Sequence, residues 1–491
     1  MSQAIQRSMA HGAAWMVLFK LLERSLGAIS TLILVRLLAP KDFGVVAMAT
    51  SFIAMAELLS AFGFDVALIQ KQDAPEEHYH TAWTLNAVMG LCITILMLAL
   101  AKPVAVFYKE PGLLWVVLAL ALGPSITGCA NVGVVAFRKE LNFRREFQFQ
   151  IAKKIVGFSV VIPLAFWLHS YWALVSGTLA GKLAGTVMSY RIHPFRPRYS
   201  LSGAGALFRF SKWLLISNFF EFLKMRASDF LIGRVQGPTM LGLYNISAEF
   251  ANLPTTELGA PINRALLPGF ARIGNDVAAL SSAYTNAIGF VAMLVVPAAA
   301  GIFSVADFLV PVVLGAKWAG AAPLLKLLAL NGAMTVIEGG IYTMLLAIGY
   351  PHDVTRVNAV YVTVQVVLML LLVARFGTVG AAYAALFGSA CAAPFFLFFL
   401  RKHTGIPSSA FLRAVSRPVA AALVMAVVLR WVLPSRVAAI PGFGSLAWLV
   451  GAVCAGACVY VAALFGIWYA VGRPDGPERM ALERVRTEVL M

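Results

Sequence analysis

The stretch LVRLLAPKDFGVVAMA (34–49) decides the fold, because its pattern of identical residues recurs later in the chain, in IGRVQGPTMLGLYNIS (232–247). Both stretches carry Arg, Pro and Gly at the same positions, and each joins two apolar segments. The same register extends outward to further identical pairs: Trp15 and Trp213, Glu23 and Glu221, Ser30 and Ser228, Phe52 and Phe250, Ala67 and Ala265, and Leu68 and Leu266. A match without gaps across two apolar hairpins predicts that a unit of several helices has been duplicated.

Composition indicates that this duplicated unit lies in lipid. The chain has 491 residues, of which 60% are hydrophobic and 12% are charged, and its mean hydropathy is +0.83. Soluble domains carry about 25% charged residues. Lipid supplies no hydrogen-bond partners to the backbone, so spanning segments are helices or closed barrels. The apolar runs of about 20 residues fit helices and lack the alternation of barrel strands, which predicts an all-α polytopic membrane protein.

About fourteen spans are expected, arranged as six, six and two. They cover residues 12–36, 43–64, 82–102, 112–136, 150–168, 171–191, 210–233, 241–262, 284–305, 320–347, 356–375, 378–400, 415–433 and 444–471. The repeat register maps the first span onto the seventh, so both halves have the same orientation, as in transporters built from parallel repeats. We therefore expect an N-terminal lobe at 1–200, a repeated lobe at 201–403, and two additional helices with a cytoplasmic tail at 404–491.

Charge predicts the orientation of these helices. Most Lys and Arg residues outside the spans fall in the loops on the side of the two termini, which the positive-inside rule assigns to the cytoplasm. The net charge of +17 follows from this bias and from contact with anionic lipids, so no nucleic acid partner is expected. The first apolar stretch is interrupted by Lys20, Glu23 and Arg24, which disfavours a cleaved signal peptide.

The chain carries no signature of an enzyme. It has no Gly-rich phosphate loop at a strand–helix junction, no nucleophile elbow and no ATPase signature. His78 and His80 lack further ligands at a useful spacing, so no metal site is expected. The long polar connections lie on the cytoplasmic side, which leaves no external catalytic domain. We expect no cofactor and no catalytic residues.

Charged and polar side chains within the spans point to a wet cavity, because lipid does not accommodate them. Lys20 and Arg24 share one face of the first helix, and Lys224 lies on the repeat-related seventh helix. We expect these three cations to face that cavity. Polar residues on the same helices and on the eighth helix extend the stripe: Thr31, Ser217, Ser228, Asn245, Asn252 and Thr256.

The buried carboxylates admit two interpretations. Glu23 and Glu221 either neutralise nearby Lys and Arg residues as structural pairs or take part in ion coupling. A buried carboxyl group with a raised pKa exchanges a proton, and a carboxylate among carbonyls holds sodium. The candidates for either role are Glu23, Glu57, Glu221, Glu249, Glu257 and Glu338. Arg226 and Asp229, close to a helix end, are interpreted either as side chains that extend to the membrane surface or as an interface pair.

Several segments resemble one known family. They are LVRLLAPKDFGVVAMA (34–49), FGFDVALIQ (62–70), VAFRKELNFRRE (135–146), SDFLIGRVQGPTMLGLYNISAEFANLP (228–254) and RALLPGFARI (264–273). Together they resemble the polysaccharide transporter, or Wzx-type, family of the multidrug/oligosaccharidyl-lipid/polysaccharide exporter superfamily. The resemblance covers essentially residues 10–400, whereas 401–491 agrees in helix count more than in motif.

The resemblance implies a flippase of the bacterial inner membrane. Such a protein carries an undecaprenyl-pyrophosphate-linked oligosaccharide to the periplasmic leaflet for exopolysaccharide, capsule or O-antigen assembly, alongside polysaccharide polymerase and export proteins. Lys20, Arg24 and Lys224 are the expected ligands of its pyrophosphate, since Lys and Arg form strong charge-assisted hydrogen bonds with such an anion. The expected mechanism is alternating access of two lobes driven by a cation gradient. The coupling ion is a proton or sodium, and the sequence does not choose between them.

Three other functions are considered. A peptidoglycan-lipid flippase of the same superfamily shares the helix count and a cationic cavity, but these motifs resemble it less. A multidrug antiporter is expected to have a more acidic or aromatic pocket. A membrane-embedded glycan polymerase or ligase needs a large periplasmic loop with catalytic groups, and the opposite-side loops here are short.

Overall fold

The computed structural model describes most of the chain. The described residues are 22–23, 25–58, 68, 75–140, 142–202, 204–254, 259–274, 276–432, 443–474, 476–480 and 482–483. All regular secondary structure within these ranges is helical. The chain divides into two compact units, Met1–Gly242 and Leu243–Met491, which are described separately below.

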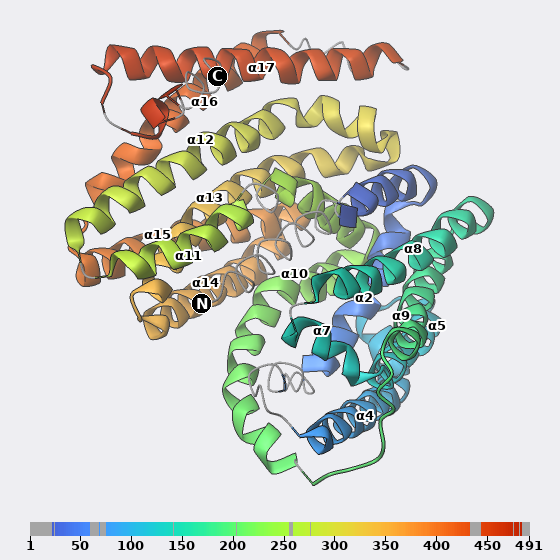
Figure 1. Ribbon diagram of the computed structural model, residues 1–491. Helices are drawn as coiled ribbons and strands as arrows, with labels where there is room; N and C mark the ends of the chain where they lie inside the picture. Colours follow the sequence, from blue (N-terminus) through green and yellow to red (C-terminus); the bar gives the residue numbers. More distant parts are fainter. Residues whose placement is uncertain are drawn as a thin grey trace. The chain divides into compact units, whose positions relative to one another are not determined.

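The first unit contains the helix Ser25–Leu37 and a series of helices that continues into α10. These are α2 Pro40–Leu58, α4 Glu76–Tyr108, α5 Leu113–Leu120, α6 Leu122–Gly128, η1 Val132–Val134, α7 Val135–Lys139, α8 Phe143–Leu168, α9 Trp172–Ile192 and α10 Ala204–Pro254. The helices α8 and α9 pack side by side (Figure 1). Gly157 of α8 and Gly181 of α9 allow this approach, since an added Cβ on either glycine would contact the other's Cα.

The second unit begins within α10 and continues with a series of longer helices. These are α11 Ala260–Ile273, α12 Val277–Leu309, η3 Val310–Leu314, η4 Ala316–Ala321, α13 Ala322–Ala347, α14 Pro351–Phe376, α15 Thr378–Thr404, α16 Ser408–Val432 and α17 Phe443–Ala470. In this unit α16 packs against both α12 and α17 (Figure 1). Gly377 and Gly405 separate α14, α15 and α16 with positive φ angles of 60° and 70°, which glycine adopts without strain.

The prediction of an all-α polytopic membrane protein is confirmed. Among the described residues, 8 helices are long and apolar enough to cross a membrane, or up to 9 if one bent pair forms a single span. The count of about fourteen is not established. The predicted span 112–136 is a broken one, because Leu113–Gly128 and Val132–Lys139 meet at an angle of 66°. At the break, the Asn131 side chain accepts a hydrogen bond from the N–H of Gly133 at 2.9 Å and so starts a new helix.

The predicted spans 210–233 and 241–262 also differ from the structure, which joins most of both into α10. Gly237 interrupts this helix with φ 80° and ψ 179°, a conformation that favours glycine. Pro238 follows the break, just as Pro40 begins α2 in the first repeat. The turn predicted between two spans is therefore present as a sharp change of direction inside one continuous helical segment.

The repeated frame also forms a contact within the first unit. A Cβ on Gly44 would overlap the carbonyl group of Pro238, and a Cβ on Gly242 would overlap the carbonyl group of Pro40. The duplicated glycines thus pack each against the proline of the other repeat. Nearby, the hydroxyl of Ser51 donates to the buried carboxylate of Asp229 at 2.6 Å. The predicted pairing of Asp229 with Arg226 is confirmed by an ion pair of 3.1 Å.

Candidate functional site

A polar cavity of about 630 Å³ lies in the first unit between the helix Ser25–Leu37 and the α8–α9 pair. Residues of α6, η1 and α7 complete its wall. Four basic side chains line it, together with a single carboxylate, that of Glu146: Arg138, Lys153, Lys154 and Lys182. Most of this wall is formed by two helical faces, one on α8 and one on α9.

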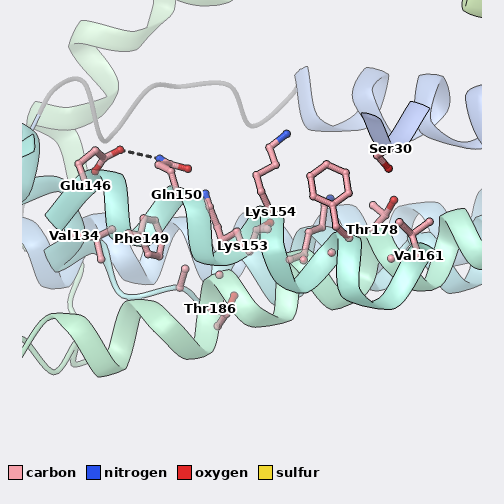
Figure 2. Close-up of a pocket in the computed structure, with 18 of the residues that line it drawn as sticks. Ser30, Val134, Glu146, Phe149, Gln150, Lys153, Lys154, Val161, Thr178 and Thr186 are labelled. Atoms are coloured by element: carbon pink, nitrogen blue, oxygen red, sulfur yellow. Dashed lines mark hydrogen bonds between the residues drawn. The ribbon is translucent and has the colours of Figure 1, made fainter. Parts of the chain in front are cut away.

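The α8 face combines polar residues at the start of the helix with small and apolar residues farther along. Glu146, Gln150, Lys153, Gly157 and Val161 recur at helical spacing and all line the cavity. Figure 2 shows Lys153 and Lys154 rising from neighbouring positions, and Gln150 joined to Glu146 by a hydrogen bond of 2.7 Å. The carboxylate of Glu146 also accepts from Arg138, at 2.9 Å, which connects α7 to α8. Two of the four cations, Lys153 and Lys154, are therefore carried by one continuous helix.

The α9 face makes room for long side chains through its glycines. A Cβ on Gly185 would lie 2.6 Å from the Cδ of Lys153, so this glycine accommodates the lysine stem. Gly123 of α6 accommodates Lys182 in the same way, because a Cβ on this glycine would lie 2.7 Å from the Nζ of Lys182. The hydroxyl of Thr186 donates to the carbonyl oxygen of Ile126 at 2.6 Å and fixes α9 against α6. Small residues thus set the positions of the two lysines.

Two of the lysines are paired with carboxylates from the first two helices. Lys154 lies 3.5 Å from Glu23, and Lys182 lies 3.7 Å from Glu57. These are long ion pairs between partly exposed groups, and such pairs contribute about 0.2–1 kcal/mol. Another anion can therefore replace either carboxylate at its lysine with a small loss of free energy.

Lys153 differs from the other three cations of the cavity. In the described part of the chain, no carboxylate lies within salt-bridge distance of its ammonium group. Its nearest described partner is the ring of Phe149, with Nζ 4.6 Å from the ring centroid. A cation held over an aromatic face and facing a polar cavity retains its capacity to bind an anion. Lys153 is therefore the strongest candidate anion ligand of the described cavity.

The structure brings two of the sequence-predicted residues to this cavity. Glu23 and Glu57 are not lining residues, but each is paired with a lysine of the lining, Lys154 and Lys182 respectively. The first helix contributes Ser30 and Leu34 to the lining, and Figure 2 shows Ser30 pointing toward α8. Thr31, the predicted polar residue, is partly buried on the adjacent face of that helix.

The remaining predicted residues are distributed over α10 and α13 or lie outside the description. Lys224 is partly buried and Ser228 is buried on α10, whereas Asn245 is partly buried and Glu249 and Asn252 are exposed. Glu338 is buried on α13. Lys20, Arg24, Thr256 and Glu257 lie outside the described residues, as do the side chains of Ser217 and Glu221. The predicted roles of all these residues stay predictions.

Sequence reasoning did not bring the four cations of the cavity together. It counts Arg138, Lys153 and Lys154 with the cytoplasmic side, and it counts Lys182 among the ionisable residues within spans. In the structure Arg138 lies on α7, the two lysines of this group lie within α8, and Lys182 lies on α9. A signal for the site was nevertheless present. The spacing from Glu146 through Gln150 and Lys153 to Gly157 marks one polar face leading into an apolar helix.

Comparisons with known proteins agree with this architecture. Residues 33–323 match a family described as "Polysaccharide biosynthesis protein". The chain is 24% identical over 469 residues to the succinoglycan biosynthesis transport protein ExoT of Rhizobium meliloti, covering 92% of each protein. It is 24% identical over 344 residues to the lipopolysaccharide biosynthesis protein WzxC of Escherichia coli, covering 68% of this chain and 69% of that protein.

A solved structure shows a similar fold. The lipid II flippase MurJ in an inward closed conformation superposes with a TM-score of 0.75, covering 93% of this chain and 99% of that one. The sequence identity is 12%, so this likeness describes the arrangement of the helices and not the ligand.

Proposed function

This chain belongs to the polysaccharide biosynthesis protein family, and we propose on that basis that it is a flippase for polyprenyl-diphosphate-linked oligosaccharides. The resemblance predicted from its sequence motifs is confirmed at the level of the family. Full-length similarity to a succinoglycan transport protein supports transport as the activity. The substrates expected from the sequence are undecaprenyl-pyrophosphate-linked repeat units for exopolysaccharide, capsule or O-antigen.

The observation that carries this proposal is the excess of positive charge in the cavity of the first unit. Its lining contains four basic side chains and one carboxylate. A diphosphate is a compact anion that several Lys and Arg donors hold through charge-assisted hydrogen bonds. We assign the first contact to Lys153, which carries no described carboxylate partner, and further contacts to Lys154 and Lys182. Lys20, Arg24 and Lys224 stay predicted ligands of the same headgroup.

The rest of the cavity suits a sugar better than a drug-like cation. Gln150, Thr178 and Thr186 contribute amide and hydroxyl groups to the lining, and Phe149 and Phe158 contribute rings. Sugars use both kinds of contact, since their hydroxyls bond to polar groups and their C–H faces pack on aromatic rings. A lipophilic cation, the expected substrate of a multidrug antiporter, would meet like charges at this site.

We assign ion coupling to Glu23 and Glu57. A substrate anion that binds Lys154 or Lys182 competes with these carboxylates for the same ammonium groups. A carboxylate that loses its counter-ion carries an uncompensated charge, which favours binding of another cation. Headgroup binding is thereby linked to cation uptake, so that a proton or sodium gradient drives the cycle.

The proposed setting is the bacterial inner membrane, with both termini in the cytoplasm. Alternating access of the two predicted lobes, 1–200 and 201–403, would carry the headgroup across while the polyprenyl chain stays in lipid. Residues 404–491 would form the two additional helices and the tail. A polysaccharide polymerase and export proteins are the proposed partners.

Ligand-induced stabilisation of the purified protein tests the substrate class. The unfolding temperature is measured with a synthetic undecaprenyl-diphosphate-linked trisaccharide, with undecaprenol, and with tetraphenylphosphonium. Because a ligand at 100 times its dissociation constant adds about 2.7 kcal/mol to stability, we expect a clear increase with the diphosphate lipid alone. Stabilisation by tetraphenylphosphonium without any by the diphosphate lipid would favour a multidrug transporter instead.

A further inference from the structure

The second unit contains a polar cavity that transport does not explain. It has a volume of about 930 Å³ and lies between the first turns of α12, the first turns of α16 and the chain that follows α17. Its basic lining residues are Arg413, Arg417 and Arg479, and Ser281, Ser282 and Ser416 contribute hydroxyl groups. This composition is typical of a site for a phosphate-bearing ligand.

The described residues after α17 form one wall of this cavity and contact the neighbouring helices closely. The carboxylate of Glu478, which is 1% exposed, lies 3.2 Å from the guanidinium of Arg417 on α16. The indole N–H of Trp468 donates to the carbonyl oxygen of Pro474 at 3.0 Å. A Cβ on Gly289 of α12 would lie 2.8 Å from the ring of Pro477. Close packing between this segment and the helices α12 and α16 thus builds this wall of the cavity.

Pairing leaves one cation of the cavity available. Arg417 is paired with Glu478, and Arg479 is paired with Glu483 at 2.9 Å. Arg413 has no carboxylate within salt-bridge distance among the described residues, and its Nε donates to the carbonyl oxygen of Ser409 at 3.3 Å. The described cavity therefore suits a ligand with one negative charge.

An apolar groove of about 730 Å³ runs along the same three helices. Met293 and Leu309 of α12 line it, together with Leu429 of α16 and Leu464 of α17. Leu482 also lines the groove, while its neighbour Glu483 lines the polar cavity. Cavity and groove therefore meet at the segment that follows α17.

We propose that the cavity and the groove together bind an anionic phospholipid. The phosphate would contact Arg413 and the serine hydroxyls, and an acyl chain would lie between α12, α16 and α17. From Met293 to Leu309 the helix extends about 24 Å, which accommodates an acyl chain that crosses one leaflet of about 15 Å. The single available cation matches the single charge of phosphatidylglycerol. This inference does not depend on the proposed transport activity.

Native mass spectrometry of the purified full-length protein in mixed micelles tests the proposal. The probes are phosphatidylglycerol and the zwitterionic phosphatidylcholine with identical acyl chains, compared at equal concentrations. We expect phosphatidylglycerol to bind at least tenfold more tightly, and Arg413→Gln to abolish this preference. Arg375→Gln removes an exposed arginine that lies outside the cavity and serves as the matched control.

A second variant, Ala457→Phe, fills the groove without changing charge, and we expect it to weaken binding of both lipids. Equal affinity of the intact protein for the two lipids would overturn the proposal. In a competition experiment, undecaprenyl phosphate should not displace bound phosphatidylglycerol more effectively than added phosphatidylglycerol does. If it does, the proposal is overturned, since the site would then belong to the polyprenyl substrate. Lys153→Gln should leave phosphatidylglycerol binding unchanged, which separates this test from that of the transport site.

Discussion

Lys153 is the single residue on which anion binding depends most strongly. Its substitution by Gln removes the charge and keeps a polar side chain of similar reach. Since hydrogen bonds to charged groups contribute about 1.5–3 kcal/mol, we expect the affinity for the diphosphate lipid to fall roughly ten- to a hundredfold. Lys153→Arg should retain most of the affinity.

Dissociation constants from a titration measure this effect. Lys102→Gln, at an exposed lysine of α4 outside the cavity, is the matched control and should bind normally. Unchanged affinity of Lys153→Gln would remove Lys153 from the site.

The Glu23–Lys154 pair distinguishes ion coupling from structural locking. Glu23 and Lys154 are 25% and 51% exposed, so their coupling in a double-mutant cycle of unfolding should stay below about 1 kcal/mol. We expect Glu23→Gln to weaken the dependence of transport on the imposed cation gradient while stability changes little. A coupling energy of several kcal/mol with an unaltered gradient dependence would make the pair a structural lock.

At the scale of elements, the repeated turn makes a specific contact that substitutions can test. Gly44→Ala and Gly242→Ala each introduce a Cβ against a backbone carbonyl that cannot rotate away. Overpacking of this kind costs about 1–3 kcal/mol, and we expect a lower free energy of unfolding in both variants.

Gly466→Ala on α17 is the matched control, because an added Cβ there meets no atom within 4 Å. It should be neutral or stabilising by about 0.5–1 kcal/mol, since alanine favours helix. Equal stability of all three variants would show that the repeats do not meet at these glycines.

The sequence predicted the helical elements better than their ends. Apolar length is a local property, which is why α4 and α12 to α17 fall close to the expected spans. Breaks depend on backbone contacts that a linear pattern does not contain, as the bend around Asn131 illustrates. The start of α8 at Phe143 was missed because its first turns are charged, and Glu146 in those turns lines the cavity.

At the scale of the whole molecule, composition and the internal repeat predicted the class of protein, and the resemblance of its sequence motifs identified the family. They did not predict which basic residues line a cavity. Lys153 and Lys154 are adjacent in the sequence, yet Glu23 pairs with Lys154 and not with Lys153. Such differences arise from packing against glycines such as Gly185, a contact between helices that only the folded chain reveals.

Membrane orientation is predicted for the whole chain and is open to direct measurement. In a background without the 5 native cysteines, Ser202→Cys should react with a membrane-impermeant maleimide from the cytoplasm. Lys109→Cys should react from the opposite side. Both residues are exposed, and the predicted topology places the loop after α4 in the periplasm and the loop between α9 and α10 in the cytoplasm. Labelling of both positions from the same side would contradict the predicted orientation of the first lobe.

The most direct test of the central claim is leaflet transfer in proteoliposomes. A fluorescent undecaprenyl-diphosphate-linked oligosaccharide is placed in one leaflet, and its exposure to a membrane-impermeant quencher is followed under an imposed proton or sodium gradient. We predict transfer by the intact protein and by Lys102→Gln, and at least tenfold slower transfer by Lys153→Gln of matched abundance. Absence of transfer by the intact protein under every imposed gradient would contradict a flippase, and equal transfer by all three proteins would contradict the assigned headgroup site.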